Sequence, residues 1–170
     1  MILNRDYFSQ PATVLATDIL GKFLCRKTAD GIVRARITET ECYFGEEDTA
    51  CHAHKGKTER TKPMYEEGGI TYVYLCYGIH YMLNIVTGPK NHPQAVLIRG
   101  VDAANGPGRA TKYLQITTKD NAIELCEENG IWLEDNGSRP AYNSLPRVGI
   151  DYASKEDRER HWRYIIKERE

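Results

Sequence analysis

The sequence predicts an α+β fold: a single compact domain over residues 1–170, with a curved, antiparallel-leaning sheet, a protruding hairpin and surrounding helices. Its 170 residues at 19.4 kDa suffice for one domain with its own core and are too few for two ordinary ones. Three β-prone runs occupy the middle of the chain, and helical patterns lie toward both ends. Strands and helices segregated in this way are typical of the α+β class.

The N-terminal part begins with a predicted helix and a strand. Ser9 can cap a helix whose apolar residues keep to one face as far as Leu24, and Pro11 suits its first turn. Residues 30–31 are a turn signal. Apolar and polar residues then alternate over 32–41, which predicts a strand with one solvent-facing side. This strand delivers Glu41 and, on the same face, Tyr43.

The middle of the chain contains a long polar segment and a predicted hairpin. Residues 45–69 are rich in Gly, Lys and Thr, and compact domains usually keep such a segment for a purpose. Runs 70–76 and 79–86 are predicted as hairpin strands that turn at Tyr77 and Gly78, and 94–99 as a third strand. Helices are predicted at 108–115, 120–128 and 154–167, with turns at 129–130 and 136–137.

Composition excludes several classes of protein. Hydrophobic residues make up 41% of the chain and charged residues 28%, which excludes disorder, fibrous repeats and a membrane protein. The five cysteines form no Cys-x-x-Cys pair, so neither a disulfide framework nor a zinc ribbon is expected. No signal-peptide pattern opens the chain, and we expect a cytoplasmic protein that is not secreted. The net charge of −1 neither indicates nor excludes a polyanionic partner, because binding a polyanion requires only a local basic patch.

Glu41 is the first candidate for chemistry. It ends an alternating strand beside Tyr43 and precedes the polar segment that contains His52. A carboxylate next to aromatic rings is partly desolvated, which raises its pKa and suits a general base that activates water. The alternative is that Glu39 and Glu41 are ordinary solvated residues at a strand end.

The segment Cys51-His52-Ala53-His54 raises the question of a metal site, because His-x-His on a strand points both rings the same way. No second His or Cys cluster at ligand spacing accompanies it, and the other histidines are dispersed. The sequence therefore favours a hydrogen-bonding histidine in a loop, and neither a metal nor another cofactor is expected.

Four tyrosines cluster in the hairpin, namely Tyr72, Tyr74, Tyr77 and Tyr81. Tyr72 and Tyr74 share one strand face, and cross-strand aromatic packing accounts for Tyr72 and Tyr81. It does not account for Tyr77, because a ring at a hairpin tip has little to pack against in its own domain. Such a ring is suited to entering a base stack.

Asn84 and Arg99 are polar residues inside runs that otherwise look buried. Burial of either is costly without a partner, and a site where a carboxylate, an arginine and an amide converge supplies one. Residues 106–109 lack the Gly-Lys-Ser/Thr ending of a nucleotide loop, so an NTP site is excluded. A set of basic residues has two interpretations: a surface that follows a phosphate backbone, or an ordinary solvated face. These residues are Lys55, Lys57, Arg60, Lys62 and Arg109.

In this order the motifs resemble the alkyladenine (3-methyladenine) DNA glycosylase family of single-domain base-excision enzymes. The resemblance spans nearly the whole chain. Segment 154–170 departs from the family's usual ending, and Cys42 and Cys51 stand where small residues are more usual. The matching segments are residues 39–43, 47–53, 71–78, 82–85, 96–99, 105–109, 132–134 and 146–150.

The resemblance implies a role for each candidate. Glu41 is expected to be the general base that activates water, with Arg99 helping to hold it, and Tyr77 is expected to fill the gap left in the duplex. The pocket of the flipped purine is expected to comprise Tyr43, His52, Tyr74 and Asn84, with the asparagine crowding the amino group of a normal guanine.

The chain is therefore expected to be a monofunctional glycosylase that excises 3-methyladenine, 7-methylguanine, hypoxanthine or ethenoadenine from damaged double-stranded DNA. We expect a monomer, nucleoid-associated if bacterial, with no membrane partner. One alternative is a non-catalytic module that binds damaged DNA. A second is a metal-dependent hydrolase that uses Glu41, His52 and His54.

Overall fold

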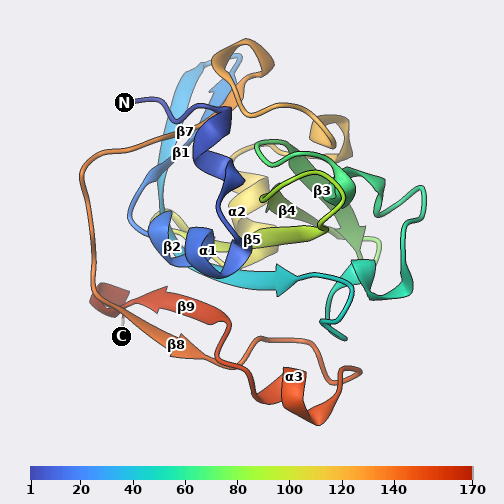
Figure 1. The fold of residues 1–170 in the computed structure, drawn as a ribbon. Coiled ribbons are helices and arrows are strands. Elements are labelled where there is room, and N and C mark those ends of the chain that lie inside the picture. Colours follow the sequence, from blue (N-terminus) through green and yellow to red (C-terminus); the bar gives the residue numbers. More distant parts are fainter. Residues whose placement is uncertain (170) are drawn as a thin grey trace.

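The structure is a computed structural model that describes residues 1–169. In this part of the chain an open sheet of nine antiparallel strands packs with three α-helices, which confirms the α+β class (Figure 1). The strands are β1 (Phe23–Thr28), β2 (Gly31–Phe44), β3 (Thr71–Cys76), β4 (His80–Val86), β5 (Gln94–Val101), β6 (Ala104–Asn105), β7 (Ile131–Glu134), β8 (Tyr142–Leu145) and β9 (Arg163–Ile166). The helices are α1 (Ala12–Asp18), α2 (Pro107–Tyr113) and α3 (Lys155–Glu159).

Strand β2 is the centre of the sheet. Its 14 residues pair with β1 in their N-terminal half and with β5 in their C-terminal half, within the order β3-β4-β5-β2-β1-β7. The free side of the C-terminal half is taken by β9, which also pairs with β8. Register shifts between Ile37 and Thr40 mark an irregularity where the partners change. The end of β2 therefore has a hydrogen-bonded strand on each side.

The two faces of the sheet have different partners. Val73, Leu83 and Val96 point into the main core, which α1 and α2 share. Residues that alternate with them, such as Tyr72 and Ala95, face the long polar segment 45–69 and join a second, smaller cluster. The predicted site residues on these strands belong to this second face.

Helix α1 is shorter than the sequence predicts. Its Leu15 is fully buried against the sheet, but Ser9 lies in a preceding 3-10 turn, and Pro11 precedes the helix without a side-chain cap. The predicted extension to Leu24 was wrong. The chain turns at Gly21, whose φ of 87° favours glycine, and Leu24 is buried as part of β1.

The C-terminal third differs most from the prediction. The helix predicted at 120–128 is replaced by 3-10 turns. A capping box formed by Thr117 and Asp120 stabilises the start of the first turn. The helix predicted at 154–167 ends with α3, and residues 163–166 instead form β9. The sequence did not predict β1, β7 or β8 as strands. These strands are short and pair with strands far away in the sequence, and a local pattern does not reveal such pairing.

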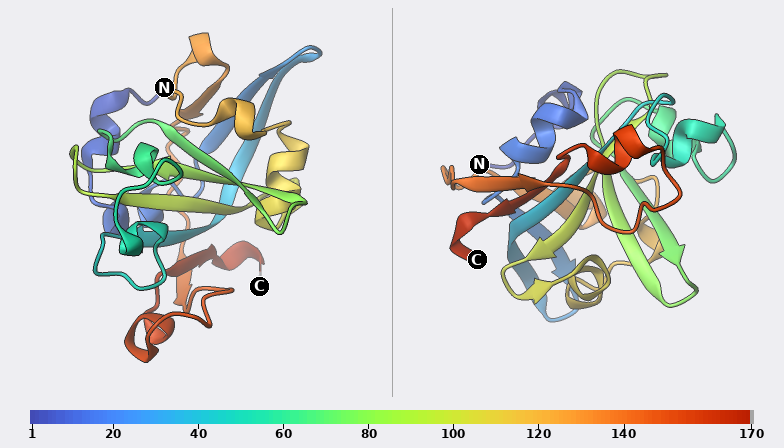
Figure 2. Two further views of the ribbon diagram at one scale, coloured as in Figure 1. Left: turned by 90° about the vertical axis from the view of Figure 1, so that its right-hand side faces the viewer. Right: turned by 90° about the horizontal axis from the view of Figure 1, so that it is seen from below.

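The predicted β3–β4 hairpin is confirmed, and its tip lies beside α2 (Figure 2, left). Tyr77 and Gly78 are the central residues of the turn, and the Ile79 amide donates to the Cys76 carbonyl at 3.1 Å. Both central residues have positive φ, 53° for Tyr77 and 69° for Gly78. This region is unfavourable for a tyrosine, so the local backbone gives no reason for its presence at the tip.

Tyr72 and Tyr81 both pack within the domain, but they do not pack across the hairpin against each other. Tyr72 pairs with Asn84, whereas Tyr81 pairs with Leu75, so the two rings lie on opposite faces. Tyr81 packs against the main core, and Tyr72 belongs to the second cluster.

All five cysteines are free. Cys42 is buried in the main core and Cys51 in the second cluster, where burial raises the pKa of the Cys51 thiol to about 12. Both act as small apolar side chains at neutral pH. No helix within residues 1–169 has the length and apolar character that a membrane crossing needs.

Candidate active site

Four residues in register across neighbouring strands form the centre of the site. Glu41 of β2 lies opposite Leu97 of β5, Leu97 opposite Asn84 of β4, and Asn84 opposite Tyr72 of β3. Residues directly opposite one another share a face of the sheet, and a cavity of about 480 Å³ opens over this one. Further residues that line it include Tyr43, His52, Arg60, Tyr74, Arg99 and Val148.

Glu41 is fully buried, and both of its carboxylate oxygens accept hydrogen bonds. Oε1 accepts from the Tyr43 hydroxyl at 2.8 Å, and Oε2 accepts from the Val148 amide at 2.7 Å. Burial raises the pKa of Glu41, and the charge of Arg99 together with these two bonds partly offsets the rise. Glu41 is therefore a desolvated carboxylate, and the alternative of a solvated strand-end residue is wrong.

Arg99 lies between two carboxylates. Its Nε donates to Glu39 Oε2 at 3.0 Å and is 3.8 Å from Glu41 Oε2. Arg163 of β9 adds a second, longer contact to Glu39 at 3.4 Å. The positive charge of Arg99 reaches Glu41 as an ion pair, while its hydrogen bond is made to Glu39.

Three aromatic rings from two segments form one wall of the cavity. The ring centroids of His52 and Tyr74 are 4.6 Å apart, and those of Tyr72 and Tyr74 are 5.4 Å apart. His52 Nδ1 also hydrogen-bonds the Tyr72 hydroxyl at 2.9 Å. Burial, with the nearby charges of Arg60 and Lys55, lowers the pKa of His52 to about 4. At neutral pH this wall consists of uncharged rings.

Asn84 adds a buried amide to the same face, as the sequence predicts. It is 4% exposed, and its Nδ2 donates to the Tyr72 carbonyl at 3.2 Å. A bond to the neighbouring strand fixes the side chain, so Asn84 presents a rigid polar surface to the cavity.

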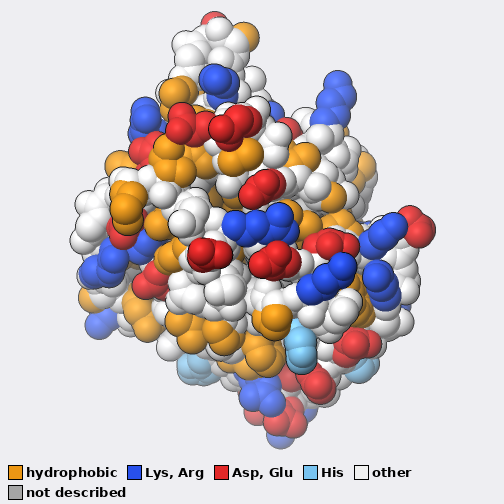
Figure 3. All heavy atoms as spheres, turned by 45° about the horizontal axis from the view of Figure 1, so that its top comes forward, with side chains coloured by type: hydrophobic (Ala, Val, Ile, Leu, Met, Phe, Trp, Pro, Cys, Tyr) orange, Lys and Arg blue, Asp and Glu red, His pale blue; other side chains and the backbone are white. Residues whose placement is uncertain are grey.

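The basic candidates differ in their position relative to the cavity, and Lys55 and Arg60 both line an adjoining one. Among them only Arg60 lines the cavity, and Lys57 lies 5.7 Å from the ring centroid of Tyr65. Lys55, Lys62 and Arg109 are exposed, the last of them on α2. On the face of the molecule drawn in Figure 3, acidic and basic side chains are interspersed.

The proposed metal ligands are not brought together. Within residues 1–169, no three His, Cys, Asp or Glu side chains are placed to hold a metal ion. His54 Nδ1 hydrogen-bonds the Glu46 carbonyl at 2.7 Å and lines an adjoining cavity, away from Glu41. The metal-dependent alternative therefore lacks its ligand set in the described part of the chain.

Comparison with known proteins identifies the family. The model of the methylpurine-DNA glycosylase family matches residues 6–104 and 101–170. The chain belongs to this family. It is 41% identical to a protein of Psychrobacter cryohalolentis over 89% of this chain and 86% of the relative. It is 42% identical to one of Borreliella burgdorferi, covering 98% and 96% of the two chains, and 38% identical to one of Methanocella arvoryzae, covering 98% and 92%.

Each of these relatives is named as a candidate 3-methyladenine DNA glycosylase. The protein is accordingly a DNA glycosylase, a hydrolase of base-excision repair with DNA as its substrate. This confirms the family that the motifs of the sequence indicate.

In this glycosylase a buried ion pair lies directly behind the site. Arg147 donates to Asp48 twice, at 2.7 and 2.9 Å, and its side chain and that of Asp48 are 0% and 1% exposed. The Arg147 guanidinium carbon also lies 4.9 Å from the Tyr43 ring centroid and 5.0 Å from that of Trp162. Two groups donate hydrogen bonds to Glu41: Tyr43, which Arg147 contacts, and Val148, which follows Arg147 in the sequence.

The divergent C-terminal segment of the glycosylase packs against this site. The Cys42 amide donates to the Trp162 carbonyl at 2.8 Å, and Glu41 pairs with Arg163 in the β2–β9 ladder. In Figure 2 (right) the β8–β9 pair and α3 are seen together on this side of the molecule. Segment 154–169 therefore supports the strand that carries the carboxylate.

Sequence reasoning missed three contributors to the glycosylase site. Val148 acts through its backbone amide, which no side-chain pattern reveals, although residues 146–150 matched a family motif. Tyr72 was assigned to packing, and the signal that it belongs with Tyr74 was their shared strand face. Arg147 stands in the same motif as Val148, and an arginine between apolar residues signals a buried ion pair.

Proposed function

We propose that this glycosylase excises alkylated and deaminated purines from damaged duplex DNA by flipping the nucleotide into the cavity and attacking its N-glycosidic bond with water. The Glu41 carboxylate carries the proposal, because it is buried beside aromatic rings in a cavity of about 480 Å³. Ligand pockets of about 300–1,000 Å³ hold small molecules, so a purine fits.

Glu41 is assigned the role of general base. An ionised carboxylate has about four acceptor positions, and Tyr43 and Val148 use two of them, so two remain to accept from a water. The carboxylate takes a proton from water as the water oxygen bonds to C1′ of the sugar. The C1′–N bond breaks, and its electron pair leaves with the base. Glu41 and its negative charge also stabilise the positive charge that develops on the sugar.

The cavity walls are assigned to recognition of the flipped base. The rings of Tyr43, His52 and Tyr74 offer uncharged surfaces for stacking and hydrogen bonding. Asn84, which also lines the cavity, is assigned to crowding the amino group of a normal guanine. Arg99 is assigned to holding the negative charge of Glu41 in place, through its 3.8 Å contact.

Tyr77 is assigned to the space that the flipped nucleotide leaves. Its side chain is 90% exposed, and the turn holds it at positive φ on the rim of the cavity. A ring inserted between base pairs offsets part of the cost of unstacking, which is a few kcal/mol. Retention of a strained tyrosine at an exposed tip supports a role for the ring outside its own domain.

The Tyr77→Ser variant is expected to bind a duplex with an abasic site about tenfold or more weakly, since a stacked base and ring are worth about 1–3 kcal/mol. Equilibrium anisotropy titration measures the affinity, and the thermal midpoint should not fall because the ring is exposed. Tyr142→Ser, which removes a 42% exposed tyrosine away from the cavity, is the matched control. Equal affinities for the Tyr77 variant and the native protein would rule out the insertion.

On acidification, the rate of base release is expected to fall at a higher pH than it would if Glu41 had the pKa of an ordinary glutamate. The base must be ionised, and burial raises the pKa of Glu41, so acidification protonates it while exposed carboxylates are still ionised. Single-turnover rates on a neutral lesion, measured from pH 4 to 9, check this. An acid limb at the ordinary pKa of glutamate, about 4.3, would contradict the raised pKa.

Single-turnover release of free base tests the proposed function. Separate duplexes carry hypoxanthine, ethenoadenine or methylated purines, and each is incubated with the native protein with and without EDTA. Release that survives EDTA and leaves an intact abasic strand is expected. If no duplex loses a base while lesion DNA still binds, the damaged-DNA-binding module becomes the better account.

A further inference from the structure

We infer that Arg60 sets the balance between charged and neutral substrates, by opposing purines that carry a positive charge on the ring. The inference rests on the proposed function. Purine nucleotides methylated at N3 of adenine or N7 of guanine are cationic, whereas hypoxanthine and ethenoadenine are neutral at pH 7. A fixed cation at the cavity discriminates between these two chemical classes through charge alone.

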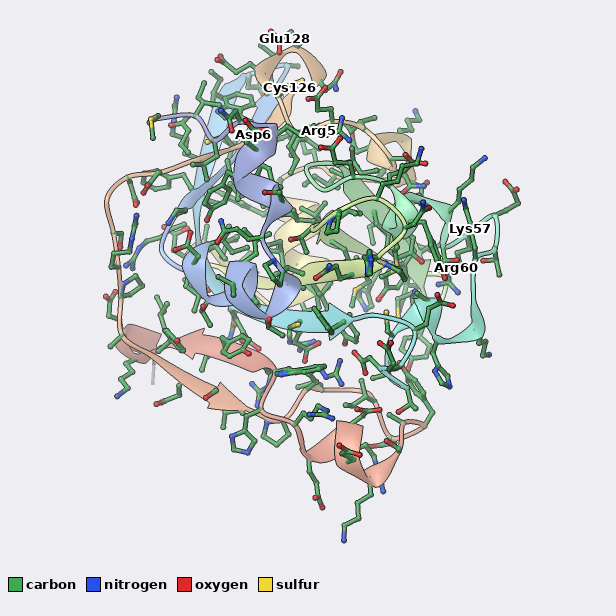
Figure 4. The ribbon with its side chains drawn as sticks, viewed as in Figure 1. Arg5, Asp6, Lys57, Arg60, Cys126 and Glu128 are labelled. Carbon is green, nitrogen blue, oxygen red and sulfur yellow. The ribbon has the colours of Figure 1, made fainter. Side chains whose placement is uncertain are left out.

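Arg60 is exposed to solvent at the cavity. It belongs to the long segment 45–69, drawn at the right of Figure 4, and lines the cavity together with His52 and Tyr74. Its guanidinium carbon is 5.1 Å from the ring centroid of Tyr74. Arg60 also lines the adjoining cavity of about 680 Å³, so it stands on the boundary between the two.

The charge of Arg60 is not neutralised by any carboxylate among the described residues. None of the ion pairs formed among residues 1–169 includes it. Its field reaches the aromatic wall, where it helps to lower the pKa of His52 and partly opposes the rise in the pKa of Tyr72. A cationic purine against that wall experiences the same repulsion.

The remaining charges of the site show what Arg60 changes. Arg99 and Arg163 together offset the negative charges of Glu39 and Glu41. Without Arg60 this group of charges is therefore neutral overall. With Arg60 it carries one net positive charge, which disfavours a cationic base.

Tyr74 adds a second effect in the same direction. A cation near an aromatic ring interacts with the electron-rich face of that ring. Because the Arg60 guanidinium already makes this interaction with Tyr74, the ring offers less of it to a cationic purine. A neutral purine stacks without needing it and loses little.

The test is a ratio of rates on two substrates. Duplexes of one sequence carry 7-methylguanine or hypoxanthine at the same position, and kcat/KM for the first is divided by that for the second. Loss of affinity for the phosphate backbone lowers both values equally and cancels. Arg60→Gln is expected to raise the ratio about three- to tenfold, the size of one unit charge acting through a partly hydrated site.

Three further variants sharpen the result. Arg60→Lys keeps the charge and should leave the ratio near the native one, whereas Arg60→Glu should raise it beyond the glutamine variant. Lys57→Gln removes a cation from the same segment that does not line the cavity, and should change both substrates equally. Because Arg60 is exposed, none of its variants is expected to impair folding.

An unchanged ratio in Arg60→Gln, or the same rise in Arg60→Lys, would overturn the inference while leaving the proposed function intact. Failure of the proposed function looks different, because the native protein would then release neither base.

Discussion

Replacing Glu41 by Gln is expected to lower the single-turnover rate of base release by about 10²–10⁴-fold, the usual contribution of a general base, while binding to lesion DNA is retained. The glutamine carbonyl can accept from the Val148 amide, and its NH₂ can donate to the Tyr43 hydroxyl oxygen. The variant therefore keeps the local geometry and loses only the proton acceptor and the charge. Base release is measured by product separation, and binding by anisotropy.

Glu46→Gln is the matched control for this variant. Glu46 is an exposed carboxylate near the end of the same strand and does not line the cavity, so the native rate is expected. A Glu41→Gln protein with a rate close to the native one would remove Glu41 from the mechanism. Loss of both release and binding would instead indicate a misfolded site.

Replacing Asp48 by Ala is expected to lower the free energy of unfolding by about 3–5 kcal/mol, because it leaves the buried Arg147 charge without its partner. Asp48 also accepts from the Phe44 and Ala50 amides at 3.0 Å each, and these donors would lose their acceptor. Arg147 Nε already has no hydrogen-bond partner among residues 1–169. Urea unfolding followed by fluorescence measures the change.

Glu156→Ala provides the comparison for the buried pair. Glu156 pairs with Arg160 at 2.7 Å, but the two side chains are 77% and 40% exposed, so a cost of about 0–1 kcal/mol is expected. If the Asp48 and Glu156 variants lose the same stability, the buried pair contributes no more than a surface one.

The residues that could be predicted from the sequence are those whose own pattern is local. Strict alternation places Glu41 on a strand, although this strand runs on to Phe44. A turn dipeptide between two β-prone runs places Tyr77 at a tip. Asn84 and Arg99 stood out as polar residues among apolar ones, and both line the cavity.

What could not be predicted depends on partners distant in the sequence. Residues 163–166 follow a charged, helix-like run, and although tyrosine and isoleucine favour strands, so short a segment does not show where the helix ends. Their pairing with β2 and β8 makes them a strand. The Val148 amide becomes important because the fold brings it to a carboxylate at position 41. Neither contact leaves a periodic signal, so composition and spacing alone do not reveal them.

The pairing of Glu41 with Arg163 joins a strand that is synthesised early to one that is synthesised late. Translation delivers β2 early, but β9 and the Val148 amide only near the end. Contacts between such distant positions form late, after the cost of closing a long loop has been met. A nascent chain therefore lacks the Val148 hydrogen bond to Glu41 and the β9 partner of β2 until these late segments have left the ribosome and docked.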